Sequence, residues 1–258
     1  MRIEGKVALI TGASEGIGAA CADAFRRRGA KLALTARSAA RLSAAGGSAA
    51  LILASDLLDP EARRRVVEET IRHYGRIDIL VNSAGIGTYA PAWRAPLDQV
   101  RHMFELNYFA ALEMAQLCIP AMRRQGSGMI VNIGSIAGKM TLPWCTLYSS
   151  TKYALGSLTD GLRMELRRDG IHALTVCPGY VSTAFQDHVL EGRPPESMRQ
   201  ARKYAISAQQ CAEAIAGGVE RNARTVVTPR LGWLAVALER LFPRMVDARM
   251  EQMYYRTQ

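Results

Sequence analysis

The chain has 258 residues, of which 49% are hydrophobic and 22% are charged. This composition predicts a globular protein with a sizeable core and argues against disorder. No apolar run reaches the ~18 residues of a membrane-spanning helix, so we expect no transmembrane helix. Its formal net charge is +10, but the arginines fall in short runs near predicted helix ends and not in an aromatic-interleaved stripe, so we expect no nucleic-acid partner. The five cysteines and four histidines show no metal-ligand spacing, so we expect a reduced, cytoplasmic protein with no metal site.

Short apolar runs alternate with helix-like segments along the chain. The predicted strands cover 6–11, 31–36, 50–55, 77–85, 128–135, 172–179 and 224–229, and the predicted helices cover 16–29, 38–47, 59–75, 98–125, 147–168 and 211–220. Asp59 with Pro60, and Ser207 with Gln210, are N-terminal helix signals. The alternation predicts an α/β fold of βαβ units, a doubly wound parallel sheet with helices on both faces. Without a linker or a repeat, residues 1–258 are expected to form one domain.

A glycine-rich loop follows the first predicted strand. The stretch TGASEGIG, Thr11 to Gly18, runs directly into a predicted helix, and its glycines permit a tight turn and a close approach of a diphosphate to the helix N-terminus. The spacing is G-x-x-x-G-x-G. We expect this loop to bind a dinucleotide through Gly12, Ser14, Glu15, Gly16, Ile17 and Gly18.

The end of the second predicted strand indicates which dinucleotide is bound. NAD-binding proteins usually carry an acidic residue there for the ribose 2′-hydroxyl, whereas this chain has Ala36, Arg37 and Ser38. An arginine can bind the 2′-phosphate, so we favour NADP(H). The alternative is an exposed surface arginine, and the charge of Glu15 weighs against the assignment. Asp56 is a candidate for the adenine amino group, or a local turn cap.

The stretch YSSTK places Tyr148 and Lys152 four residues apart. On a helix these positions share one face. A neighbouring cation lowers the pKa of a phenol, so the pair can supply a general acid or base near neutral pH. The alternative is a solvated surface pair.

Six motifs carry a family resemblance: TGASEGIG, NSAG at 82–85, ELN at 105–107, IGS at 133–135, YSSTK and PGYVST at 178–183. In this order and spacing, from about residue 4 to 230, the chain resembles the short-chain dehydrogenase/reductase family. The resemblance implies a Rossmann-type fold, with Tyr148 as proton donor and Lys152 holding the nicotinamide ribose and lowering the tyrosine pKa. Ser135 would hold the substrate carbonyl, Asn107 would kink a helix and support a relay water, and Asn82 would steady the sheet. Further cofactor positions implied are Leu57, Asn82, Ala84, Gly85, Pro178, Gly179, Val181 and Thr183.

Two segments should form the substrate wall and lid in this family. The wall lies between Ser135 and Tyr148, and the lid covers 183–206. We expect an apolar pocket, or else ordinary loop packing, from Met140, Leu142, Trp144, Cys145 and Tyr180. The lid is basic and can meet an acidic carrier protein, a phosphate or solvent through Arg193, Arg199, Arg202 and Lys203.

The C-terminal extension, 231–258, is apolar and rich in arginine. We favour a helix packed on the subunit or its partner, with a helix on an anionic membrane surface as the alternative. The surplus of apolar residues on the predicted helices 98–125 and 147–168 predicts a homodimer or homotetramer.

The residues and the resemblance together predict an NADPH-dependent oxidoreductase that reduces a lipophilic ketone or aldehyde, steroid-like or sphingoid-like. One alternative is a 3-oxoacyl-[acyl-carrier-protein] reductase, against which the extended C-terminus argues. Another is a non-catalytic NADP(H)-binding sensor or scaffold, against which the intact Ser135, Tyr148 and Lys152 set argues.

Overall fold

The structure, a computed structural model, describes residues 1–192 and 205–255. Its centre is a seven-stranded sheet in the order β3-β2-β1-β4-β5-β6-β9, with every neighbouring pair parallel. The order reverses between β1 and β4, and in such sheets ligands bind beyond the carboxyl ends at this point. The predicted parallel sheet is confirmed. Its strands are β1 (Val7–Thr11), β2 (Lys31–Ala36), β3 (Leu51–Ala54), β4 (Ile79–Asn82), β5 (Gly128–Ile133), β6 (Ile171–Pro178) and β9 (Thr225–Thr228).

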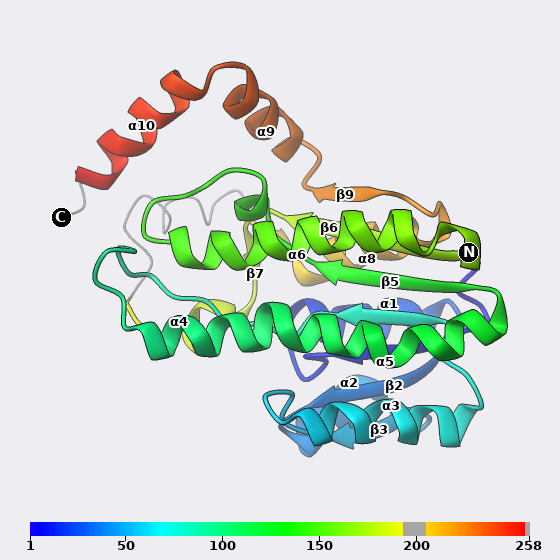
Figure 1. The fold of residues 1–258 in the computed structure, drawn as a ribbon. Helices are drawn as coiled ribbons and strands as arrows, with labels where there is room; N and C mark the ends of the chain where they lie inside the picture. The colour runs from blue at the N-terminus through cyan, green and yellow to red at the C-terminus, as the bar shows by residue number, and fades with distance from the viewer. Residues whose placement is uncertain (193–204, 256–258) are drawn as a thin grey trace.

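Helices cover both faces of this sheet (Figure 1). On one face lie α1 (Gly16–Arg27), α2 (Ala39–Gly46) and α8 (Ala208–Glu220), and on the other lie α3 (Pro60–Tyr74), α4 (Leu97–Phe104), α5 (Ala110–Gln125) and α6 (Thr146–Glu165). Successive residues of a strand point to opposite faces. Ile10 therefore packs in the cluster that contains Phe25 of α1, whereas Leu9 packs in the cluster that contains Met114 of α5. Both faces are buried, as a doubly wound sheet requires.

The predicted helix starts are present. The Asp59 side chain accepts a hydrogen bond of 2.9 Å from the Glu61 N–H at the start of α3. Ser207 and Gln210 form a capping box at α8, in which each side chain accepts from the other residue's backbone N–H. These contacts satisfy donors that a helix end would otherwise leave without partners.

The helix expected over 98–125 is interrupted. Between α4 and α5 the chain forms η1 (Glu105–Phe109), a single π-helical turn. Such turns inside helices mark functional sites in many proteins. Here the turn contains Asn107, at the place where the family resemblance implies a kink.

The C-terminal extension forms two helices, α9 (Gly232–Leu241) and α10 (Pro243–Tyr255). Pro243 lacks the backbone N–H that would continue α9, and the proline instead occupies the first position of α10. The pair projects from the body after β9, and α10 lies on the side where the strands end (Figure 1). Val236 is buried, whereas Leu234, Leu241 and Phe242 are more than half exposed. Within the described ranges, none of the helices combines the length and apolarity needed to cross a membrane.

Candidate active site

A cavity of about 850 Å³ lies beyond the carboxyl ends of the strands. Its walls come from the loop between β1 and α1, from the chain just after β2, β4, β5 and β6, and from α6. Two residues of α10 complete it. Most predicted cofactor positions are among its lining residues: Gly12, Ser14, Glu15, Gly16, Ile17, Arg37, Ser38, Asp56, Leu57, Ala84, Gly85, Tyr148, Lys152, Pro178, Gly179, Val181 and Thr183.

The phosphate loop has the tight geometry that its glycines predict. Gly12 has a φ of +63°, and a Cβ there would lie 2.8 Å from the Cα of Ala84. A Cβ on Gly18 would lie 2.2 Å from the carbonyl oxygen of Gly12. The absence of a side chain on Gly18 therefore lets the loop at Gly12 pack closely on α1. Gly18 is not among the residues that line the cavity. Glu15 is the N-cap of α1 and its side chain makes no capping hydrogen bond. The first-turn N–H groups of α1 therefore fit the diphosphate of a dinucleotide.

The chain after β2 and β3 forms the other end of this groove. Arg37 is exposed, and both Arg37 and Ser38 line the cavity. Ser38 is also the N-cap of α2 and accepts a hydrogen bond from the Arg41 N–H. Asp56 lines the cavity while its carboxylate accepts from the Leu58 N–H at 3.0 Å, so the turn-cap role is present there as well.

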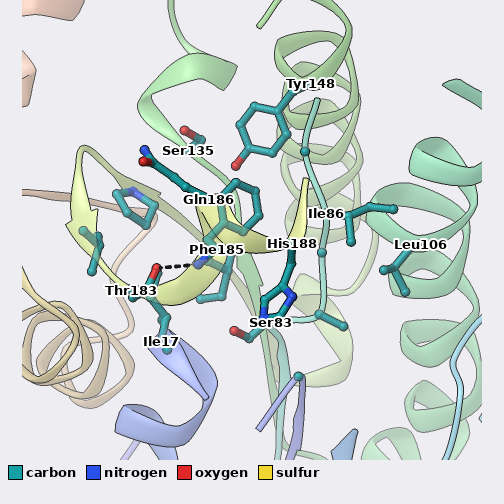
Figure 2. A pocket seen from close by; sticks show the side chains of 18 of the residues that line it. Ile17, Ser83, Ile86, Leu106, Ser135, Tyr148, Thr183, Phe185, Gln186 and His188 are labelled. Carbon is teal, nitrogen blue, oxygen red and sulfur yellow. Dashed lines mark hydrogen bonds between the residues drawn. The ribbon is translucent and has the colours of Figure 1, made fainter. Parts of the chain in front are cut away.

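Ser135, Tyr148 and Lys152 meet at the middle of the cavity. Figure 2 shows the Tyr148 phenol and the Ser135 side chain on the same side of the cavity. Ser135 begins a short helical turn, in which its Oγ accepts from the Ala137 N–H at 3.1 Å. Lys152 lies one turn along α6 from Tyr148. Its Nζ donates to the Ile133 carbonyl at 2.9 Å and lies 5.6 Å from the centroid of the phenol ring.

Burial sets the protonation of this pair. It raises the pKa of Tyr148, and the hydrogen bond from Ser135 opposes that shift without reversing it. Burial also lowers the pKa of Lys152, to about 8. The net shift of the Tyr148 pKa is therefore upward, opposite to the direction expected from the spacing alone, and its largest cause is burial. Near neutral pH the phenol is protonated and Lys152 is predominantly charged.

Asn107 supports the site from behind the cavity wall. Its side chain is buried within the π-helical turn and is not among the lining residues. It is hydrogen-bonded to the backbone of Ile86, which does line the cavity, and its Nδ2 donates to Thr151 Oγ1 at 3.1 Å. The asparagine thus ties the loop after β4 to the helix that carries Tyr148 and Lys152.

Three further predicted positions are also not among the cavity-lining residues. Asn82 donates from Nδ2 to the Ala111 carbonyl and to Asn132 Oδ1, so it joins the sheet to α5 and does not face a cofactor. Met140 is buried. Trp144 has a φ of +61°, in the left-handed region, and its ring packs on Tyr254 of α10 with the centroids 5.0 Å apart.

The substrate end of the cavity is largely apolar. Leu142, Cys145 and Tyr180 line it as predicted, and Phe185 packs 5.7 Å from the Tyr148 ring, centroid to centroid (Figure 2). Several lining residues were not predicted from the sequence: Ile86, Leu106, Phe185, Gln186, Met250 and Met253. The spacing of Met250 and Met253, three apart on a helix, was the available signal for that face. Of the predicted lid, Arg193, Arg199, Arg202 and Lys203 lie outside the described residues.

Comparisons with known proteins agree with this geometry. Residues 6–194 match the family model described as short chain dehydrogenase. The chain is 32% identical to 11-beta-hydroxysteroid dehydrogenase 1A of Arabidopsis thaliana, over 94% of this chain and 74% of that protein. Among solved structures, a short chain dehydrogenase from Burkholderia cenocepacia in complex with NADP is 28% identical, with a TM-score of 0.83 over 97% of this chain and 99% of that one. A 3-ketoacyl-(acyl-carrier-protein) reductase from Brucella melitensis, complexed with NADH, is 27% identical, with a TM-score of 0.80 over 88% and 97%.

Proposed function

The chain belongs to the short-chain dehydrogenase family, and from that premise we propose that it reduces the carbonyl group of a lipophilic ketone or aldehyde with NADPH. The observation that carries the proposal is the position of Ser135, Tyr148 and Lys152. They lie in one cavity, between a dinucleotide-binding loop and an apolar pocket. A non-catalytic sensor on the same fold has no need of this set of residues.

The three side chains divide the chemistry of carbonyl reduction. Bound NADPH would supply the hydride to the carbonyl carbon. Ser135 donates a hydrogen bond to the carbonyl oxygen, and Tyr148, neutral because burial raises its pKa, gives the same oxygen its proton. The charged Lys152, 5.6 Å from the phenol ring, stabilises the phenolate that remains. Asn107 positions the helix and the loop on which these groups are carried.

The assignment of NADPH depends on Arg37. Its guanidinium can bind a 2′-phosphate, and Ala36 stands where an acidic residue would hold the ribose 2′-hydroxyl of NAD. The Burkholderia relative in complex with NADP supports this choice. The NADH complex of the Brucella relative makes a direct comparison of the two cofactors the appropriate test.

A lipophilic substrate suits the walls of the pocket. Tyr180, Phe185, Met250 and Met253 face the cavity, and methionine adapts to ligands of varied shape. Similarity to a hydroxysteroid dehydrogenase supports a polycyclic ketone. The second candidate, reduction of a 3-oxoacyl thioester, is favoured by the Brucella relative. The C-terminal helix α10, which contributes Met250 and Met253 to the cavity wall, argues against it.

One assay separates these functions. NADPH oxidation is followed with a polycyclic ketone, a long-chain aldehyde, a 3-oxoacyl thioester and a small ketone, and is repeated with NADH. We expect turnover of the first two at higher kcat/KM than the others, and faster with NADPH. Turnover of the thioester alone would favour the carrier-protein substrate, and no turnover of any would favour a sensor.

We also propose that the chain forms a homodimer or homotetramer. Phe109, Tyr153 and Met164 are exposed on η1 and α6, although Met103 and Met114 of the neighbouring helices are buried within the subunit. Exposed apolar surface of this kind supports association. Light scattering at micromolar concentration should give a mass of at least twice 28.2 kDa, and a monomer would contradict the proposal.

A further inference from the structure

The carboxylate of Glu15 is held by two side chains from two other parts of the fold. Arg41 of α2 donates from Nη1 to Oε2 at 2.9 Å, and Nε2 of His188, at the end of η4 (Ala184–His188), lies 2.9 Å from Oε1. All three residues line the cavity. Each carboxylate oxygen thus has a partner from a different element.

This carboxylate lies where negative charge opposes the proposed ligand. Glu15 is the N-cap residue of α1, at the helix end that fits a diphosphate. A 2′-phosphate adds about −1.5 to −2 further charges near neutral pH. Arg37 is the cation expected to bind it, and Arg41, on α2, is four residues further along the chain. Without Arg41, the Glu15 carboxylate would lose its arginine partner and keep only His188, and its charge would offset the attraction of Arg37 in the same groove.

We propose that Arg41 is a specificity-determining residue that acts through Glu15. By neutralising this carboxylate, Arg41 allows the cleft to accept the 2′-phosphate that Arg37 binds, while His188 holds the second oxygen from the opposite wall. The inference rests on the proposed binding of NADP(H). It differs from a direct contact of Arg41 with the phosphate, and the two roles make opposite predictions for a double variant.

The test uses adenosine 2′,5′-bisphosphate and adenosine 5′-monophosphate, which differ only in the 2′-phosphate. Their affinities are measured by titration calorimetry at low ionic strength for the wild type, Arg41→Ala, Glu15→Gln and the double variant. Arg41→Ala should weaken the bisphosphate on the order of tenfold, and the monophosphate by less. Glu15→Gln should leave the bisphosphate bound at least as tightly as in the wild type. The double variant should return close to wild-type affinity, because no carboxylate remains to be neutralised.

Two outcomes overturn the proposal. If the double variant binds the bisphosphate as weakly as Arg41→Ala does, Arg41 contacts the phosphate directly. If Arg41→Ala binds the bisphosphate as tightly as the wild type does, Arg41 has no role in recognising the 2′-phosphate. The assignment of NADPH is tested separately by the wild type. If the wild type binds the bisphosphate and the monophosphate equally tightly, that assignment is wrong. Arg64→Ala is the matched control, since Arg64 pairs with Glu61 on α3 and is not among the cavity-lining residues. The loss in Arg41→Ala should also shrink at about 1 M salt, where charges are screened beyond roughly 3 Å, whereas a misfolded loop would show no such dependence.

Discussion

Asn107 and Ile86 are joined by a reciprocal pair of hydrogen bonds. The Ile86 N–H donates to Oδ1 of the asparagine, whose Nδ2 donates back to the Ile86 carbonyl, and both distances are 2.9 Å. This pair holds the loop after β4 against the π-helical turn, and the bond to Thr151 extends the link to α6. One buried side chain therefore fixes the spacing between the cavity wall and the helix that carries Tyr148.

Replacing Asn107 by leucine should reduce both stability and turnover. It leaves the N–H and C=O groups of Ile86 without these partners, at a cost of up to about 1–3 kcal/mol for each, reduced because both groups are only partly buried. Urea unfolding gives the stability, and kcat per folded enzyme gives the second effect. Asn132→Ala is the control, because Asn132 braces the sheet through Asn82 and Thr159 away from the cavity. It should lose stability with a smaller change in kcat. Equal kcat losses in the two variants would assign Asn107 a structural role only.

Arg37→Asp should reverse the cofactor preference. The substitution exchanges a cation for a carboxylate at the position proposed to hold the 2′-phosphate. A charge-assisted hydrogen bond is worth about 1.5–3 kcal/mol, so NADPH affinity should fall roughly 10–100-fold. Binding of NADH should stay the same or tighten. Fluorescence titration of both cofactors measures this, and a wild type that binds NADH as tightly as NADPH would refute the assignment of Arg37.

The pH dependence of NADPH capture should report Lys152. Burial disfavours its charged form and lowers its pKa to about 8, so the ammonium group is lost as the pH rises through that value. Because kcat/KM for NADPH reflects ionisations of the free enzyme, it should fall above about pH 8. In Lys152→Arg the side chain keeps its charge and this limb should disappear, even if the overall rate is lower. If kcat/KM for NADPH falls at the same pH in the variant, the fall reports the ionisation of a group other than Lys152.

The chain from Pro243 onward should determine the size of substrate that the pocket accepts. This segment brings Met250 and Met253 to the cavity and Tyr254 to Trp144. Ending the chain at Phe242 should raise KM for a polycyclic ketone far more than for a small ketone, with little change in NADPH affinity. Met245→Ala is a point control, since Met245 is exposed on the same helix. Unchanged kinetics together with lost binding to anionic vesicles would instead indicate a membrane contact.

The alternation of strands and helices along the chain, the helix starts and most of the cofactor groove follow from local sequence signals. Asp59, Ser207 and the glycines at 12 and 18 act through their immediate neighbours, so their positions can be predicted from spacing. The kink at Asn107 was indicated only by the family resemblance of the ELN motif, and the contacts of Glu15 depend on residues distant in sequence that no local pattern specifies. The upward shift of the Tyr148 pKa cannot be predicted from the sequence for a similar reason. Spacing reveals the neighbouring Lys152, whereas the depth of burial is known only from the fold.

Tyr148→Phe tests the central claim most directly. The change removes one hydroxyl group from a buried ring, so the cavity and NADPH binding should be nearly unaltered. Loss of a general acid typically costs about 10²–10⁴-fold in rate. We therefore expect the variant to bind NADPH with wild-type affinity and to reduce the best ketone of the panel at least about a hundredfold more slowly. A variant that bound NADPH equally well and kept more than roughly a tenth of the wild-type kcat would contradict the role of Tyr148 as proton donor.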